Sequence, residues 1–433
     1  MKKLICICLL ACSMVHAQSQ APVHYVGGDI SLLPSYEAAR TAYKDKNGTK
    51  IDDLVSYAAN TLKWNACRVR IFVDPCILNP QDNNRQGEVQ DIAYAAALGS
   101  RIKEAGMKLL IDFHYSDTWA DPVKQYIPTA WLDLTEEELA DTVYGWTKLA
   151  MEQLVAAGAE PDFVQIGNEV SYGMLVRGNQ TRSEDRIDPG LVYDGTNSDS
   201  WARFANLLNH GIAATREVCP NAQIIIHMER TSNAIRCARY YTNLITANVD
   251  YDIIGLSYYP FWHGWITTEL TNTLTAIHNA VPDKPIQIVE TAYYNNWWPT
   301  TGVNYNTSTQ WPATPAGQAA YLEDLIDMLN SLSYVNGLYY WFPEENGNGY
   351  SSSLGYNVID NWINRGLFDP NNHKAYEGLY KLGAYRNDLT TVTGVTTTIE
   401  DGIYYSVLGT PMGTDYDALP SGVYIMNGQS IMK

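Results

Sequence analysis

Two carboxylates stand at the ends of apolar β-like runs. The run over residues 163–168 ends in Asn168 and is followed at once by Glu169, and the run over 285–291 places Glu290 next to its last residue. In a parallel barrel the carboxyl ends of all strands meet at one rim. Glycoside cleavage needs two acids there, one to protonate the departing oxygen and one to attack or stabilise the anomeric carbon. The sequence therefore predicts a sugar-cleaving pair, provided that both runs belong to one barrel.

Eight β-like runs recur along the chain, with helical patterns between most of them. Several are apolar almost throughout, as expected for strands buried on both faces of a parallel sheet. Eight strand-then-helix units predict an α/β fold, a (β/α)8 TIM barrel with long βα loops. The runs span residues 24–30, 67–72, 107–114, 163–168, 222–228, 251–258, 285–291 and 335–342.

The helical patterns carry their own start and stop signals. Gly106 is a C-cap after the pattern over 91–105, and Thr135 with Glu138 forms a capping box that opens the pattern ending near Ala157. Two more helices are expected at 200–218 and 315–332. Long connections follow four of the strands, at 74–88, 116–134, 172–200 and 293–315, and are expected on the catalytic face.

Cationic and polar side chains on the second and third strands could tune the two acids. A general acid needs a raised pKa, whereas a nucleophile must stay ionised beside donors or a cation. Arg70 and His114 end their runs and are the available donors. Arg68 has the same parity as Arg70 but lies deeper, so we expect it to form a buried structural pair.

The two ends of the 433-residue chain differ from its middle. Residues 1–17 read as a signal peptide, with Lys2 and Lys3 before an apolar segment and a cleavage site at Ala17; the competing interpretation is a lipobox that anchors the protein through Cys12. Either interpretation places the protein outside the cytoplasm, secreted, periplasmic or at the cell surface. We expect a catalytic barrel over 18–388 and a small β-rich module over 389–433.

Composition excludes several classes of partner. A net charge of −18 argues against nucleic acid, and no other apolar run approaches the roughly 20 residues of a transmembrane span. A monomer is expected. Cys67, Cys76, Cys219 and Cys237 allow up to two disulfides with the pairing open. The 31 Tyr and 12 Trp against 7 Phe suit sugar-lined clefts.

At this point the residues resemble a known family. Asn-Glu on the fourth strand and Glu on the seventh resemble the clan of retaining (β/α)8 glycosidases, and within it the chain resembles glycoside hydrolase family 53, the arabinogalactan endo-β-1,4-galactanases. The most specific segment is Asp-Phe-His-Tyr-Ser-Asp-Thr-Trp-Ala-Asp-Pro at 112–122. The other matching segments are 27–31, 68–75, 165–169, 255–264 and 289–293.

The resemblance implies cleavage of internal β-1,4-galactosidic bonds in galactan or type I arabinogalactan with retention, with Glu169 as acid/base and Glu290 as nucleophile. It further implies that Asn168 binds the sugar 2-hydroxyl, that Tyr258 or Tyr259 holds the nucleophile, and that Trp341 forms a platform under the sugar. Further cleft contacts expected on the same basis are Asp112, His114, Trp119 and Trp262, and Arg70 is added to them as the donor at the end of the second strand.

No cofactor is required by this chemistry. Some members of the family bind a structural calcium ion in the loop after the seventh strand, but here Asn and Thr outnumber carboxylates between Tyr294 and Gln310. Calcium prefers carboxylate oxygens, so its binding is not favoured.

Two alternatives remain. Another retaining clan member, such as an endo-β-mannanase, a xylanase or an endoglucanase, would share both glutamates and Asn168. From a different class, a glycan-binding protein without activity could use the same scaffold.

Overall fold

A computed structural model describes most of the chain, residues 23–40, 42–75, 88–229, 231–299, 301–347, 350–351, 356–357, 364–388, 403–406, 411–420, 423–426 and 429–433. The predicted signal peptide with Cys12 and also Cys76 lie outside the described residues. The chain divides into two compact units, Met1–Arg386 and Asn387–Lys433.

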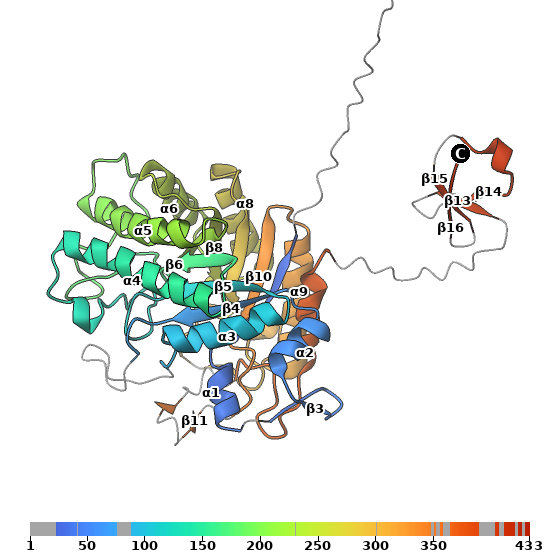
Figure 1. Cartoon of the computed structure of the whole chain (residues 1–433), viewed down its shortest axis with the longest axis horizontal. Helices are drawn as coiled ribbons and strands as arrows, with labels where there is room; N and C mark the ends of the chain where they lie inside the picture. Colours follow the sequence, from blue (N-terminus) through green and yellow to red (C-terminus); the bar gives the residue numbers. More distant parts are fainter. Residues whose placement is uncertain are drawn as a thin grey trace, which may run out of the picture. The chain divides into compact units, whose positions relative to one another are not determined.

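Eight parallel strands of the first unit close into a barrel in the order β1-β10-β9-β8-β7-β6-β5-β4 (Figure 1). The predicted TIM barrel is therefore confirmed. The ends of every strand lie within two residues of its predicted run: β1 (Tyr25–Asp29), β4 (Ala66–Ile71), β5 (Lys108–Phe113), β6 (Phe163–Ile166), β7 (Gln223–Met228), β8 (Ile253–Tyr258), β9 (Ile286–Thr291) and β10 (Val335–Trp341).

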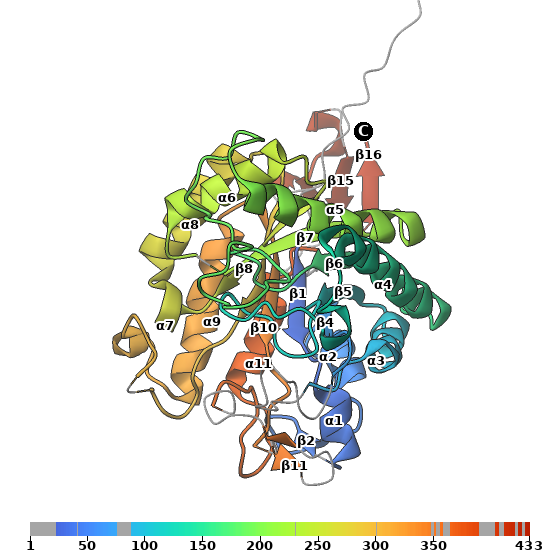
Figure 2. The same cartoon turned by 90° about the vertical axis from the view of Figure 1, so that its left-hand side faces the viewer.

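Helices surround the strands (Figure 2). The four predicted helices are confirmed as α3 (Ile92–Glu104), α4 (Glu136–Ala156), α5 (Asp199–Val218) and α9 (Pro315–Asn330). The Thr135 side chain accepts from the backbone N–H of Glu138 while the Glu138 carboxylate bonds back to Thr135, which is the predicted capping box. The ring also contains α6 (Ala234–Thr246) and α8 (Thr271–Ala280).

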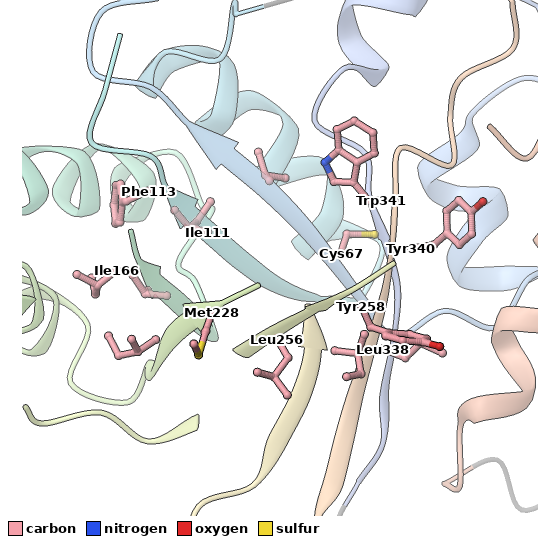
Figure 3. Close-up of a cluster of buried hydrophobic side chains, with 14 of the residues drawn as sticks. Cys67, Ile111, Phe113, Ile166, Met228, Leu256, Tyr258, Leu338, Tyr340 and Trp341 are labelled. Carbon is pink, nitrogen blue, oxygen red and sulfur yellow. The ribbon is translucent and has the colours of Figure 1, made fainter. Parts of the chain in front are cut away.

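The main apolar core lies between the strands and these helices. Figure 3 shows part of it, with Ile111 and Phe113 projecting from β5 and Ile166 from β6. All three are fully buried. Alternate residues of a strand point to opposite faces, so the residues between them face the inside of the barrel.

The inside of the barrel is layered. Near the amino ends of the strands it is apolar, with every side chain at most 2% exposed: Ala66, Leu110, Phe163, Ile225, Ile253, Val289 and Tyr339. Two residues further along four of these strands the side chains are polar and still buried: Arg68, Asp112, Gln165 and His227. The apolar layer thus closes the barrel floor, and the polar layer supports whatever lies at the carboxyl ends.

Shorter elements complete the unit. They are α1 (Leu33–Ala38), a hairpin of β2 (Tyr43–Lys44) and β3 (Lys50–Ile51), α2 (Leu54–Asn60), α7 (Pro260–His263), η1 (Thr129–Trp131), η2 (Ile266–Leu270), η3 (Thr307–Thr309), a hairpin of β11 (Tyr350–Ser351) and β12 (Tyr356–Asn357), α11 (Glu377–Lys381) and η4 (Leu382–Tyr385). None of the described helices combines the length and apolar character that crossing a bilayer requires.

The described cysteines form no disulfide. Cys67, Cys219 and Cys237 are buried, and no disulfide joins any two of these three. Burial raises the pKa of the Cys67 thiol to about 12, which keeps it protonated.

The second unit contains an antiparallel sheet in the order β14-β13-β15-β16. Its elements are β13 (Tyr404–Ser406), β14 (Pro411–Gly413), η5 (Tyr416–Ala418), β15 (Val423–Met426) and β16 (Gln429–Met432).

Candidate active site

A cleft of about 420 Å³ lies above the polar layer, at the carboxyl ends of the barrel strands. Its walls contain both predicted glutamates and most of the predicted contact residues. Those lining it are Arg70, His114, Trp119, Asn168, Glu169, Tyr259, Trp262, Glu290 and Trp341. The two that do not line it are Asp112 and Tyr258.

The backbone after β6 turns sharply to present Glu169. Gly167 has a φ of +84° and Glu169 a φ of +46°. The first needs glycine, since a Cβ at this position would come within 2.6 Å of the Val170 side chain. The second is a left-handed conformation that a glutamate rarely adopts. Such strain is found at functional sites, where the surrounding fold enforces it.

Glu169 is held by the neighbouring strands. Its Oε1 accepts a hydrogen bond of 2.6 Å from the Ser257 hydroxyl on β8. Its backbone N–H donates to Nδ1 of His227 on β7 at 3.2 Å. Neither Ser257 nor His227 was among the residues predicted from the sequence.

Glu290 is aimed into the cleft by a β-bulge in β9. Ile288 pairs with Leu256 of β8, but Ser257 pairs with Glu290, so β9 carries one extra residue at this point. Val289 belongs to the inward-facing apolar layer. Strict alternation would therefore turn Glu290 outward, and the extra residue turns it into the barrel instead.

Two donors meet the Glu290 carboxylate. Arg68 lies 2.9 Å from Oε1, and the Tyr259 hydroxyl donates to Oε2 at 2.8 Å. Tyr258 instead donates its hydroxyl to the Gly264 carbonyl at 2.8 Å, outside the cleft. Of the two tyrosines proposed to hold this carboxylate, only Tyr259 contacts it.

Arg68 is the hub of the polar layer. Its guanidinium donates to Asp29 at 2.7 Å, to Asp112 at 2.8 Å and to Asn168 Oδ1 at 2.8 Å. Burial alone would lower the pKa of Arg68, but the charges of Asp112, Glu290 and Asp29 raise it above its ordinary value. Arg68 forms the buried pairs expected of it, with Asp29 and Asp112, and it also reaches Glu290.

Arg70, expected as a donor to the two acids, contacts Asp29 and Trp119 instead. It bonds Asp29 at 3.0 Å, and its guanidinium carbon lies 4.3 Å from the centre of the Trp119 ring. It lines the cleft, and its ion pair within the described residues is with Asp29 and with neither glutamate. Asp112 lies beneath the cleft, bonded to Arg68 and Gln165.

Asn168 and His114 are fixed by the loop after β5. The Asn168 amide donates to the Ala120 carbonyl at 2.7 Å, and the Ala120 N–H donates to Nδ1 of His114 at 2.9 Å. The other ring nitrogen of His114 lies 3.1 Å from Asp112. The two side chains therefore present fixed polar groups to the cleft.

Burial raises the pKa of both glutamates, but by different amounts. For Glu169 the negative charges of Glu290 and Glu229 add to burial and hold the pKa well above its usual range. For Glu290 the Arg68 charge and the Tyr259 hydrogen bond oppose burial, so its pKa is raised less. The pair can therefore hold one protonated and one ionised carboxyl, as acid/base chemistry requires.

An aromatic wall around Arg365 closes one side of the cleft. The guanidinium carbon lies 5.2–5.7 Å from the ring centres of Tyr259, Trp262 and Trp341, which also line the cleft. Arg365 is only 2% exposed. It follows the predicted strands by more than 20 residues, so no sequence signal pointed to it.

The connection after β9 offers no carboxylate ligands for calcium. Residues 292–314 contain no Asp or Glu. Asn295 and Asn364 instead tie this connection to the segment after β10, with Asn295 donating to Gly366 at 2.8 Å and Asn364 to Trp297 at 2.9 Å. Across the described residues no cluster of three His, Cys, Asp or Glu could hold a metal ion. A connection without carboxylates fits a calcium site poorly.

Comparison with known proteins identifies relatives of the whole barrel. The model of Glycosyl hydrolase family 53 matches residues 25–381. The arabinogalactan endo-β-1,4-galactanase of Cellvibrio japonicus is 32% identical over 336 residues, covering 74% of this chain and 80% of that protein. The endo-β-1,4-galactanase of Bacillus subtilis is 30% identical over 330 residues, covering 73% and 69%.

The chain is also similar to solved structures of this family. The GH53 catalytic domain of Ignisphaera aggregans superimposes with a TM-score of 0.68 at 30% identity, over 83% of this chain and 95% of that chain. A structure of fungal β-1,4-galactanases superimposes with a TM-score of 0.66 at 26% identity, over 83% and 99%.

Proposed function

The chain belongs to glycosyl hydrolase family 53, and from that premise we infer that it is an arabinogalactan endo-β-1,4-galactanase, which hydrolyses β-1,4-galactosidic bonds of galactan. The observation that carries this inference is one cleft containing both Glu169 and Glu290 at the carboxyl ends of barrel strands. Relatives named for this activity cover most of the barrel.

We propose that Glu290 is the nucleophile. A nucleophilic carboxylate must be ionised when the sugar binds. The guanidinium at 2.9 Å and the phenol at 2.8 Å both stabilise its charged form. Of the two glutamates it has the more strongly stabilised anion.

Glu169 is the complementary acid/base. Among the described residues, the side chain that donates to its carboxyl is the neutral Ser257 hydroxyl, and burial with two neighbouring carboxylates disfavours its charge. It therefore keeps a proton that it can give to the departing oxygen.

The reaction proceeds in two displacements with net retention. In the first, Glu290 forms a bond to the anomeric carbon while the glycosidic bond breaks and Glu169 gives its proton to the departing sugar oxygen. In the second, Glu169 takes a proton from water, the water oxygen bonds to the anomeric carbon, and the bond to Glu290 breaks. Both carboxyls end in their starting protonation states.

The remaining cleft residues are proposed to bind the sugar. Asn168 is positioned beside both the Arg68 hub and the acid, consistent with a contact to the 2-hydroxyl that strengthens in the transition state. Trp341, 7% exposed and lining the cleft, supplies an aromatic face for the sugar ring. Trp119 and Trp262 are proposed to extend this surface.

We propose the export route and the oligomeric state from the sequence alone. We expect an extracytoplasmic protein, released after cleavage at Ala17 or anchored at Cys12. We also expect a monomer that needs no cofactor.

The decisive experiment is hydrolysis of linear β-1,4-galactan, with mannan, xylan and carboxymethylcellulose as parallel substrates. We expect oligosaccharides from galactan alone and, by proton NMR at early times, products of the β configuration. Glu290→Ala is expected to abolish turnover and keep binding. Activity on another polymer instead of galactan would reassign the substrate, and α products would refute the two-step mechanism. Binding without hydrolysis by the wild type would favour the glycan-binding alternative.

A further inference from the structure

We propose that His227 and Ser257 form a positioning relay that assigns the catalytic proton of Glu169 to Oε2. The relay runs from β7 through β8 to Glu169, three residues beyond the end of β6, and it keeps Oε1 of Glu169 as a hydrogen-bond acceptor. This inference rests on the proposed role of Glu169 as acid/base.

The relay begins with the orientation of the Gln165 amide. Its Nε2 bonds to Oδ1 of Asp112, and its Oε1 lies 3.4 Å from Nη2 of Arg68. A flipped amide would put oxygen against the Asp112 carboxylate and N–H groups against the guanidinium. The observed orientation is therefore fixed, with Nε2 as the donor side.

This orientation fixes the His227 tautomer. Nδ1 of His227 faces Nε2 of Gln165 at 2.9 Å and the backbone N–H of Glu169 at 3.2 Å. Both are donors, so Nδ1 must be unprotonated and accept hydrogen bonds through its lone pair. The nearby Oδ1 of Asn168, at 3.2 Å, already accepts from Arg68. A proton on Nδ1 that pointed at that oxygen would also lie against the N–H groups of the Gln165 amide and the Glu169 backbone, which repel it.

His227 also stays neutral. The side chain is fully buried. Burial, the Arg68 charge and His114 hold the pKa of His227 well below its usual value. The one ring proton therefore sits on Nε2.

Ser257 extends this direction of hydrogen-bond donation to Glu169. Its Oγ lies 2.8 Å from Nε2 of His227 and 2.6 Å from Oε1 of Glu169. Since Nε2–H donates to Oγ, the serine proton is free to point at Oε1. If Oε1 carried the acid proton and donated it to Ser257, the serine hydroxyl proton would lose its acceptor in a fully buried position.

Three other carboxylates face Glu169 from neighbouring elements, namely Glu290 on β9, Glu229 after β7 and Asp121 after β5. They raise the pKa of Glu169 along with burial, whereas the Ser257 hydrogen bond lowers it. Loss of the serine hydroxyl would thus raise this pKa further and release the carboxyl to place its proton on either oxygen.

The test compares Ser257→Ala with Ser35→Ala and Glu169→Gln in the full-length protein. Ser35 is a matched control, since it is also buried (4% exposed) and bonds a hydroxyl, that of Tyr94, away from the cleft. Each variant is assayed on β-1,4-galactan and on an aryl β-1,4-galactobioside whose phenol leaves without protonation, and kcat/KM is followed against pH.

The relay predicts a selective loss. Because general acid catalysis contributes about 10²–10⁴-fold, Ser257→Ala is expected to lose about 10-fold or more on galactan and much less on the aryl substrate. Its basic limb is expected to move to higher pH, because an acid with a raised pKa stays protonated longer. Ser35→Ala is expected to keep the wild-type kcat/KM on both substrates and the wild-type basic limb of the pH profile.

Two results would overturn the relay. One is an equal loss on both substrates with an unmoved basic limb, which would make Ser257 a structural residue. The other is a protonated or Nδ1–H form of His227 in the ¹⁵N spectrum of the wild type at the pH of maximal activity, a measurement that does not depend on any variant folding. If Glu169→Gln itself shows no selective loss on galactan, the proposed acid role fails first, which separates that failure from failure of the relay.

Discussion

The hydroxyl of Tyr259 offers a quantitative test of the nucleophile assignment. Tyr259→Phe removes the 2.8 Å hydrogen bond to Oε2 of Glu290 and leaves the ring in the aromatic wall. A hydrogen bond to a charged group contributes about 1.5–3 kcal/mol, and one pKa unit corresponds to about 1.4 kcal/mol. The pKa of Glu290 is therefore expected to rise by about 1–2 units, towards the lower value because Arg68 remains at 2.9 Å.

The sign of the pH effect follows from which form reacts. Glu290 attacks as the anion, so the acidic limb of kcat/KM on galactan reports its ionisation. A higher pKa moves that limb to higher pH and leaves the basic limb, which reports Glu169, nearly in place. The measurement is the pH profile of kcat/KM for wild type and variant at fixed ionic strength.

Tyr258→Phe is the matched control. The neighbouring tyrosine loses the same hydroxyl, but its hydrogen bond goes to the Gly264 carbonyl outside the cleft. This variant is expected to lose about 1 kcal/mol of stability and to keep the acidic limb of the wild type. An unmoved acidic limb in Tyr259→Phe, or an equal shift in both variants, would show that Glu290 does not depend on this phenol.

Three further predictions concern stability. Arg68→Met is expected to cost about 3–5 kcal/mol in urea unfolding because it leaves buried carboxylates without their partner. Arg101→Met, which breaks more exposed ion pairs with Glu37 and Asp53, is expected to cost at most about 1 kcal/mol. Equal costs for the two variants would contradict the proposed role of Arg68 as the hub of the polar layer. Burial raises the pKa of Glu345 to about 7, so the folded state binds the extra proton and stability falls as pH rises from about 4.5 to 7; Glu345→Gln is expected to remove this decline, and an unchanged slope in thermal unfolding would refute it. Chelation with EDTA is expected to leave the unfolding temperature unchanged, and a drop reversed by added calcium would show a site that the donor set does not reveal.

The barrel could be predicted because its strands and helices depend on local patterns. Eight apolar runs and the capping signals at Thr135 and Gly106 are readable from neighbouring residues alone. The positions of Glu169 and Glu290 at strand ends followed from the same runs. Their common cleft needed only the rule that parallel strands end at one rim.

The finer contacts depend on register, which the sequence does not express. Glu290 faces inward only because β9 carries an extra residue relative to β8, and alternation by itself would have turned it away. The same alternation, followed along β8, puts Ser257 inside and Tyr258 outside, and so favours Tyr259 over Tyr258. Arg365 could not be found by any periodic rule, since it lies on an irregular segment after β10.

The ion pairs beneath the cleft act together on the charge of the transition state. With Glu169 protonated, the connected side chains are Arg68 and Arg70 against Asp29, Asp112 and Glu290, which leaves one negative charge in excess. The glycosidic transition state develops positive charge at the anomeric carbon, and a fixed negative excess beside it stabilises that charge without reorganisation. Ionising Glu169 as well would add a second uncompensated negative charge beside Glu290, so burial together with the charges of Glu290 and Glu229 keeps the acid protonated until its proton is needed.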